Sequence, residues 1–223
     1  MVGRSKSAVV TAALVVLAAS PPAIAGSGNT LYLSQQGTSN TIQVDQSNAS
    51  DSTVGGVAQP LPVSGDGLSP SSLTGSASQN GFNNNAEITM TGAGGTAGLS
   101  QDNSGRPGYG NAATLTLSAG ALGLVGQLGD HNTAALTVSG ANAFGGIVQD
   151  GSNNTGKLDV AGDGVTGKLI QVGSDNHAGF TFSGASGSQA TYEVVGNSVT
   201  LTTPAAVTTI GNGASVTIVQ STP

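Results

Sequence analysis

Between residues 127 and 182 apolar positions alternate with polar ones, and the alternation recurs every 22 residues, at Gln127, Gln149 and Gln171. Each repeat opens with Gln-x-Gly-x-x-Asn and continues with small or aliphatic residues at every second position, such as Leu136 and Val138. Strict alternation is typical of a β-strand buried on one face. The residues before each Gln alternate too, and Gly and Asn tolerate the positive φ of a tight turn. Each repeat therefore predicts a strand, a turn at GxxN and a second strand.

A fixed period of this length predicts stacked repeats, because one unit is too small to bury its own apolar face. The expected fold class is all-β: a β-solenoid of strand-turn-strand rungs forming two facing parallel sheets, with about eight rungs of ~22 residues. Reflection about the turn predicts that glycines face bulky residues across the core, which keeps its thickness constant. The expected pairs are Gly123 with Val138, Gly145 with Val160, and Gly167 with Phe182. The asparagines that mark the rungs are Asn40, Asn84, Asn111, Asn132, Asn154, Asn176, Asn197 and Asn212.

Four segments are expected along the chain. Residues 1–25 have the features of a secretory signal peptide: two cations, an apolar run and a small-x-small cleavage site ending at Ala25. Residues 26–48 form a first rung, and residues 75–223 form the main solenoid. Residues 49–74 are rich in Ser, Gly and Pro and predict a loop or a degenerate rung, because Pro cannot donate to a ladder. Since Asn40 and Asn84 are two periods apart, one decayed unit is expected between them, with the first rung tethered rather than firmly stacked.

The Gln and Asn of the repeats are the candidate functional residues. A buried amide is costly unless it is hydrogen-bonded, but identical amides stacked from rung to rung satisfy one another. The alternative is that these residues only shape the turns. The predicted stacking ladders are Gln35, Gln79, Gln101, Gln127, Gln149 and Gln171, together with Asn40, Asn84, Asn111, Asn132, Asn154 and Asn176.

Composition excludes several functions. The chain of 223 residues is only 7% charged and 3% aromatic, with 36 Gly and no Cys or Trp. Without the predicted leader, three cations stand against 11 acidic residues, a net charge of −8, which argues against nucleic acid binding. The lack of Cys excludes disulfides and thiolate metal sites. No GxSxG, HExxH or P-loop motif occurs, so neither an enzyme nor a cofactor is expected.

Three further sets of residues allow either a purely structural or a functional interpretation. Asp130, Asp150 and Asp175 recur in the turns and would bind calcium only weakly. Their favoured role is to keep the turns solvated or to prevent unwanted pairing at strand edges. His131 and His177 are expected in equivalent turns without a metal. A row of threonines five residues after each Asn would bind ice or another ordered surface if it were flat, although Thr suits any exposed strand. The row consists of Thr89, Thr116, Thr137, Thr181, Thr202 and Thr217, with Asp159 interrupting it.

The motif QxGxxNxA after alternating aliphatics resembles the curlin repeat, the unit of curli fibre subunits that Gram-negative bacteria export. The stretches 79–86, 127–134 and 171–178 match fully, and 35–42 and 149–156 differ only at the last position. The resemblance covers most of residues 29–218. The family also has a second Gln six residues after the Asn, and only Gln46 keeps it here; Met90, Leu117, Val138, Val160, Phe182 and Ile218 replace it.

This resemblance implies a secreted structural subunit that self-assembles into extracellular cross-β, curli-like amyloid fibres for adhesion and biofilm matrix. The implied partners are other copies of the chain, a related curlin subunit and an outer-membrane export machinery. The implied location is a fibre on the surface of a Gram-negative bacterium. The alternative is a monomeric secreted or surface β-solenoid that binds ice, a ligand or another surface through its Thr-rich flat face.

Overall fold

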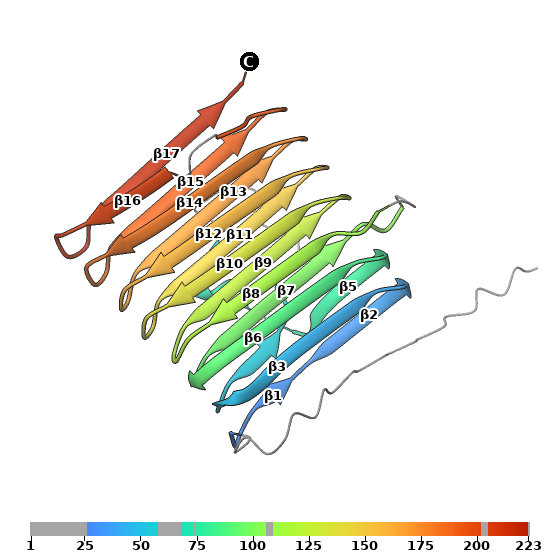
Figure 1. The fold of residues 1–223 in the computed structure, drawn as a ribbon, viewed down its shortest axis with the longest axis horizontal. Helices are drawn as coiled ribbons and strands as arrows, with labels where there is room; N and C mark the ends of the chain where they lie inside the picture. The colour runs from blue at the N-terminus through green and yellow to red at the C-terminus, as the bar shows by residue number, and fades with distance from the viewer. Residues whose placement is uncertain (1–25, 58–67, 74, 106–108, 202–204, 223) are drawn as a thin grey trace, which may run out of the picture.

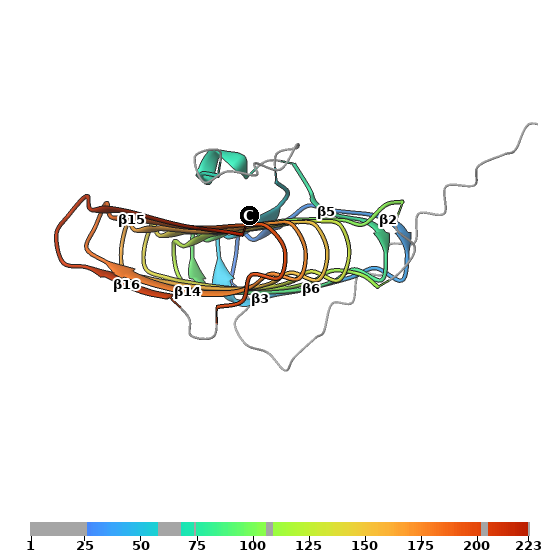
Figure 2. The same cartoon turned by 90° about the horizontal axis from the view of Figure 1, so that it is seen from above.

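The computed structural model describes residues 26–57, 68–73, 75–105, 109–201 and 205–222. They form an all-β parallel solenoid in which two sheets face each other across a thin core (Figures 1 and 2). This architecture confirms the expected fold class. Within the described ranges, no helix is long and apolar enough to cross a membrane. The predicted signal peptide lies outside the described residues.

The chain alternates between the two sheets, which we call sheet A and sheet B. Sheet A has 10 strands at eight levels, because β1 and β2 share the first level and β4 and β5 the second. Its strands are β1 (Thr30–Leu31), β2 (Leu33–Thr38), β4 (Thr53–Gly55), β5 (Ala77–Phe82), β7 (Thr96–Asp102), β9 (Leu122–Leu128), β11 (Phe144–Asp150), β13 (Thr166–Val172), β15 (Gln189–Val195) and β17 (Ser215–Ser221).

Sheet B has seven strands, one for each complete rung. They are β3 (Thr41–Ser50), β6 (Asn85–Ala93), β8 (Ala112–Leu117), β10 (Thr133–Ser139), β12 (Thr155–Ala161), β14 (His177–Gly184) and β16 (Ala205–Thr209). The solenoid therefore consists of seven complete rungs and a final strand, β17, that has no counterpart in sheet B among the described residues.

The strands pair in the register that the 22-residue period predicts. Gln149 pairs with Gln127 on one side and Gln171 on the other, and Leu158 lies between Leu136 and Phe180. The inward side chains of both sheets form one continuous apolar core. In this register each inward side chain lies beside the equivalent residue one level above and one level below.

Glycines do oppose bulky side chains across this core, but not in the pairs that reflection predicts. A Cβ built on Gly145 would lie 2.5 Å from Cγ2 of Val138 in the preceding rung and 3.4 Å from Cγ2 of Val160 in its own rung. Gly123 and Gly167 likewise lie nearest to residues of the preceding rung. The sheets are therefore staggered along the stack, with each sheet A strand between two sheet B levels. Reflection about a turn cannot detect this stagger, because it treats each rung as flat.

The expectation of a decayed unit between the first two rungs is wrong. Gln35 pairs directly with Gln79, so the first rung stacks firmly on the second. The extra residues leave sheet A after β4 and return at β5, and both strands occupy the second level. We call the described residues between these two strands, 56–57, 68–73 and 75–76, the insertion; Pro70–Ser72 forms a short 3-10 turn within it.

The insertion covers part of the outer face of sheet A (Figure 2). Its Leu68 is fully buried and belongs to a second apolar cluster with Val57, outside the solenoid core. The outward residues of this cluster come from three successive strands: Leu124, Phe144, Val148 and Ile170. Sheet A is thus buried on both faces in this region, which explains why β9, β11 and β13 carry apolar residues at outward positions.

The last two rungs differ from the expectation. The backbone N–H of Val199 donates to Oδ1 of Asn176 at 3.0 Å, so Val199 takes the ladder position and Asn197 lies two residues before it. Asn212 lies between β16 and β17, in a turn from sheet B to sheet A, whereas the ladder asparagines lie in turns from sheet A to sheet B. Asn197 and Asn212 are therefore wrong as rung markers, and residues 215–218 belong to sheet A.

Candidate functional site: two amide ladders and two open edges

Six glutamines form one continuous chain of side-chain hydrogen bonds along the core. From Gln35 to Gln171, each Nε2 donates to Oε1 of the next glutamine at 2.7–2.8 Å. The five after Gln35 are at most 1% exposed. Each of these five also donates to the carbonyl that follows the asparagine of the preceding rung, as Gln149 does to Thr133 at 3.0 Å. Burial of the amides is therefore compensated at every level.

The ladder ends at Gln171, because Val194 occupies the next position. Nε2 of Gln171 donates instead to the backbone carbonyl of Asn176 at 3.1 Å. The column becomes polar again at the last level, where Gln220 pairs with Val194. The polarity of the ladder is uniform, with donors directed toward the C-terminal end.

The asparagines are linked through the backbone. Oδ1 of each ladder asparagine accepts from the backbone N–H at the same position of the next rung, as Asn132 does from Asn154 at 3.1 Å. Nδ2 of Asn132 donates to the carbonyl of Gly151 in the next turn at 2.9 Å, and Nδ2 of Asn154 to that of Gly173 at 2.8 Å. This second ladder fixes each turn to the one above it.

Asn103 completes the asparagine ladder where the turn after Gln101 is enlarged. Its Oδ1 accepts from Nδ2 of Asn84 at 2.9 Å and from the N–H of Phe82 at 2.8 Å. Its Nδ2 donates to the carbonyl of Phe82 at 2.8 Å. Asn103 stands where the other repeats have the turn glycine, so the motif did not reveal it. Its spacing of two residues after the ladder Gln was the available signal.

The turn glycines are required by close contact between rungs. Gly151 has φ of +132°, and a Cβ built on it would lie 1.9 Å from the carbonyl oxygen of Gly173. No side chain fits this position without separating two turns, whatever backbone angle it adopts.

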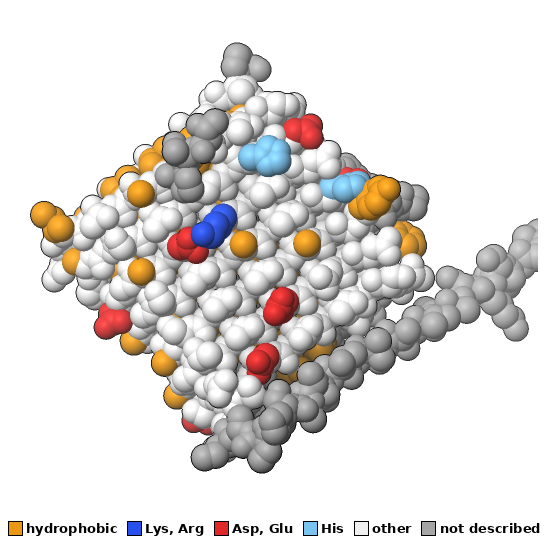
Figure 3. Space-filling view, viewed as in Figure 1, with side chains coloured by type: hydrophobic (Ala, Val, Ile, Leu, Met, Phe, Trp, Pro, Cys, Tyr) orange, Lys and Arg blue, Asp and Glu red, His pale blue; other side chains and the backbone are white. Residues whose placement is uncertain are grey.

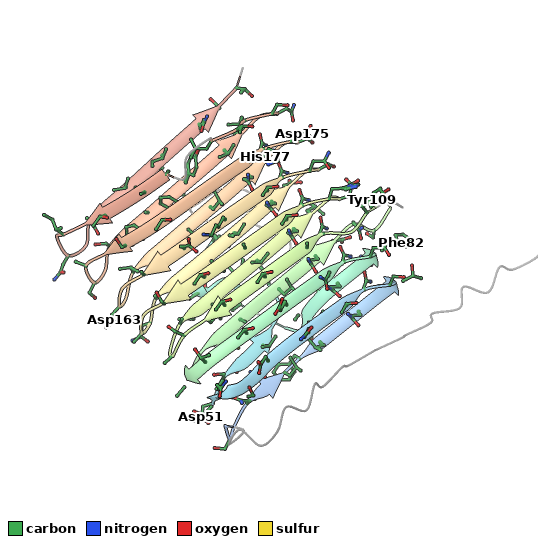
Figure 4. The ribbon with its side chains drawn as sticks, in the orientation of Figure 1. Asp51, Phe82, Tyr109, Asp163, Asp175 and His177 are labelled. Carbon is green, nitrogen blue, oxygen red and sulfur yellow. The ribbon has the colours of Figure 1, made fainter. Side chains whose placement is uncertain are left out.

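Four aspartates lie in the turns between strands: Asp51, Asp130, Asp163 and Asp175, three of which are labelled in Figure 4. Asp130 contacts Ser152 in the next turn, and Oδ1 of Asp163 accepts from the N–H of Ala141 at 2.8 Å. In the part of the chain that is described, no group of three or more His, Cys, Asp or Glu residues could hold a metal ion.

The two histidines are not equivalent, contrary to the expectation. His131 is a turn residue with φ of +58°, and its ring lies 4.5 Å from that of Tyr109. His177 is the first residue of β14 and pairs with Thr155. The difference arises because His131 precedes its ladder asparagine and His177 follows it.

The outer face of sheet B is flat and largely uncharged (Figure 3). Thr89, Thr116 and Thr137 lie in one column. The column continues with Asp159, whose carboxylate is 2.9 Å from Nζ of Lys157, then Thr181 and Ala206. Thr217 does not belong to it, because β17 is in sheet A, and Thr202 lies outside the described residues. The threonine row is therefore shorter than the sequence predicts.

Both ends of the solenoid present strand edges without a partner among the described residues. At the N-terminal end, β1, β2 and β3 each pair on one side only; at the C-terminal end the same holds for β16 and β17 (Figure 1). The inward residues Val216, Ile218 and Gln220 are half-buried because no level covers them. Oε1 of Gln220 accepts from the hydroxyl of Tyr192 at 2.6 Å, and burial raises the pKa of that tyrosine.

The fold and the ladders together define a parallel β-solenoid, a class of repeat protein. The chain matches no family model, and the curated proteins and solved structures gave no significant match.

Proposed function

We propose that the chain is a secreted structural subunit that assembles end to end into cross-β fibres, with a role in adhesion and biofilm matrix. The observation that carries this proposal is that, among the described residues, both terminal rungs have unpaired parallel edges whose strands alternate inward and outward residues as the interior strands do, apart from a β-bulge in β3. An open edge that continues a ladder recruits the next chain through backbone hydrogen bonds. The building partner is another copy of the same chain, and the resemblance to the curlin repeat adds a related subunit and an export machinery.

Low charge on the flat faces supports the same proposal. Apart from Lys157 and a few acidic groups, the outer face of sheet B carries uncharged side chains, so this face adds little repulsion between stacked copies (Figure 3). The insertion covers the apolar outward residues of β9, β11 and β13 in sheet A and limits association through that part of the face. Growth along the stack is therefore favoured over lateral aggregation.

Incubation of the chain without its predicted leader tests the proposal. We expect unbranched fibres in electron micrographs, a thioflavin response and a spacing of about 4.8 Å along the fibre axis. Val216→Lys would place a charge in the inward column of the last strand and should abolish elongation, because the lysine would be buried in the interface. The matched control is Thr217→Lys, which is outward on the same strand and should still form fibres. A chain that stays monomeric under all these conditions would contradict the proposal.

The second candidate is a monomeric solenoid that holds an ordered surface on sheet B. The column of Thr89, Thr116 and Thr137 on a flat face favours it. Thermal hysteresis in a solution of the monomer, and its loss in Thr116→Lys, would favour this function over fibre formation.

A further inference from the structure

The two ends of the solenoid are offset by half a rung. Sheet A has eight levels and sheet B has seven, so, with the sheets staggered, β17 lies half a level beyond β16. The other end begins with a complete rung, in which β1 and β2 precede β3. If a second copy were added by translation alone, its β2 would pair with β17. One strand position beside β16 would then stay empty, and N–H and C=O groups would be buried there without partners.

We infer that successive chains of the fibre are related by a half turn about the stack axis; this inference rests on the proposed end-to-end assembly. The half turn exchanges the two sheets, so β1 and β2 of the second copy pair with β16 and its β3 pairs with β17. Strands of sheets A and B run in opposite directions, and the half turn also reverses them. Both new pairs are therefore parallel, like the pairs within the solenoid, and the stack continues without a gap.

The inward side chains match in this arrangement. Gln46 lies in the β-bulge of β3 between Asp45 and Asn48, and its Nε2 is 3.8 Å from the sulfur of Met90 in the inward column of sheet B. Within one chain, this sheet B column faces the glycines of sheet A, at the end of the strands away from the GxxN turns. The half turn brings the column of the second copy to the GxxN-turn end of the first copy. There it meets the glutamine column of sheet A, which ends in Gln220. Gln46 of the second copy therefore stacks on Gln220, while its Ile42 and Val44 stack on Val216 and Ile218.

This match accounts for two departures from the repeat. Gln46 stands where the inner rungs have Met90, Leu117 and Val138, and Gln220 restores the glutamine that Val194 interrupts. Gln46 is polar in an otherwise apolar column, Gln220 is separated from the other ladder glutamines by Val194, and both lie at an end of the stack. Oε1 of Gln220 accepts from Tyr192, so its Nε2 can donate to Oε1 of Gln46 in the next chain. The glutamine ladder would thus continue across the junction in the same direction.

Cross-linking of single-cysteine variants tests the rotation, because the chain has no Cys of its own. Thr217, Gln43 and Tyr32 are all exposed on outer faces, at opposite ends of the chain. With a half turn, Thr217 lies beside Gln43 of the next copy, at a strand spacing of about 5 Å, which suits a disulfide. With translation alone, Thr217 lies beside Tyr32, and Gln43 is on the other sheet, more than about 10 Å away.

Fibres grown from an equal mixture of Thr217→Cys and Gln43→Cys chains should give a disulfide-linked dimer on mild oxidation. The matched mixture of Thr217→Cys and Tyr32→Cys chains should not. The reverse result, or fibres in which neither mixture cross-links, would overturn the half turn while leaving fibre formation intact. Absence of fibres from the unmodified chain would instead overturn the proposed function. Averaged electron micrographs give a second measurement, since a half turn places the insertion on alternating sides of the fibre and translation places it on one side.

Discussion

Replacing Gln149 by Leu tests whether the amide ladder stabilises the fold. Gln149 is completely buried, accepts from Gln127 and donates to Gln171 and to the carbonyl of Thr133. Leucine has a similar volume, so packing changes little, but three polar groups lose a partner. At roughly 1–3 kcal/mol for each such group, the loss centres on roughly 6 kcal/mol. Burial of the leucine returns about 2 kcal/mol. We therefore expect a net destabilisation of about 4 kcal/mol.

The assay is denaturant unfolding of the monomer, followed by far-ultraviolet circular dichroism at concentrations below those that support fibres. Because stacked repeats do not always unfold in two states, hydrogen exchange should locate the loss at the rungs next to Gln149. The control is Gln189→Leu, the same change at an exposed position, which should alter the free energy of unfolding by less than about 0.5 kcal/mol. Equal denaturation midpoints for Gln149→Leu and Gln189→Leu would refute the stabilising role of the glutamine ladder. The ladder residues would then have a role only in the turns.

Three other changes have defined outcomes. Gly151→Ala should destabilise the stack by more than about 1 kcal/mol, because its Cβ meets the carbonyl of Gly173; thermal melting checks this, and an unchanged melting temperature would contradict it. Leu68→Ala should lower the free energy of unfolding by about 2–5 kcal/mol, measured by denaturant unfolding, because it opens the apolar cluster over sheet A. It should also increase lateral association of fibres in electron micrographs. Unchanged stability would mean that the insertion does not pack there. Burial raises the pKa of Tyr192 above its unfolded value of 10.0, so the stability that the neutral phenol contributes is complete below about pH 10 and is lost as pH rises through the folded pKa. Hydrogen exchange at β17 should therefore become faster at alkaline pH. Tyr192→Phe should remove that pH dependence.

The repeat motif in the sequence determined the interior of this protein. Alternation of apolar residues decides which side of a strand is buried, and a constant period decides which residues stack, so the register of Gln127, Gln149 and Gln171 followed directly. The amide ladders could be predicted for the same reason, because a buried amide needs its equivalent in the next rung.

The tertiary structure decided what lies outside the period. The stagger of the sheets, the insertion over Leu124 and Phe144, and the role of Asn103 depend on contacts between segments with no fixed sequence spacing. The placement of β17 in sheet A was likewise set by pairing with β15, although Asn212 imitates the motif. The local pattern of apolar and polar residues determines which face of a strand is buried. The sheet and the level that the strand joins depend instead on which strand edge is free to pair with it.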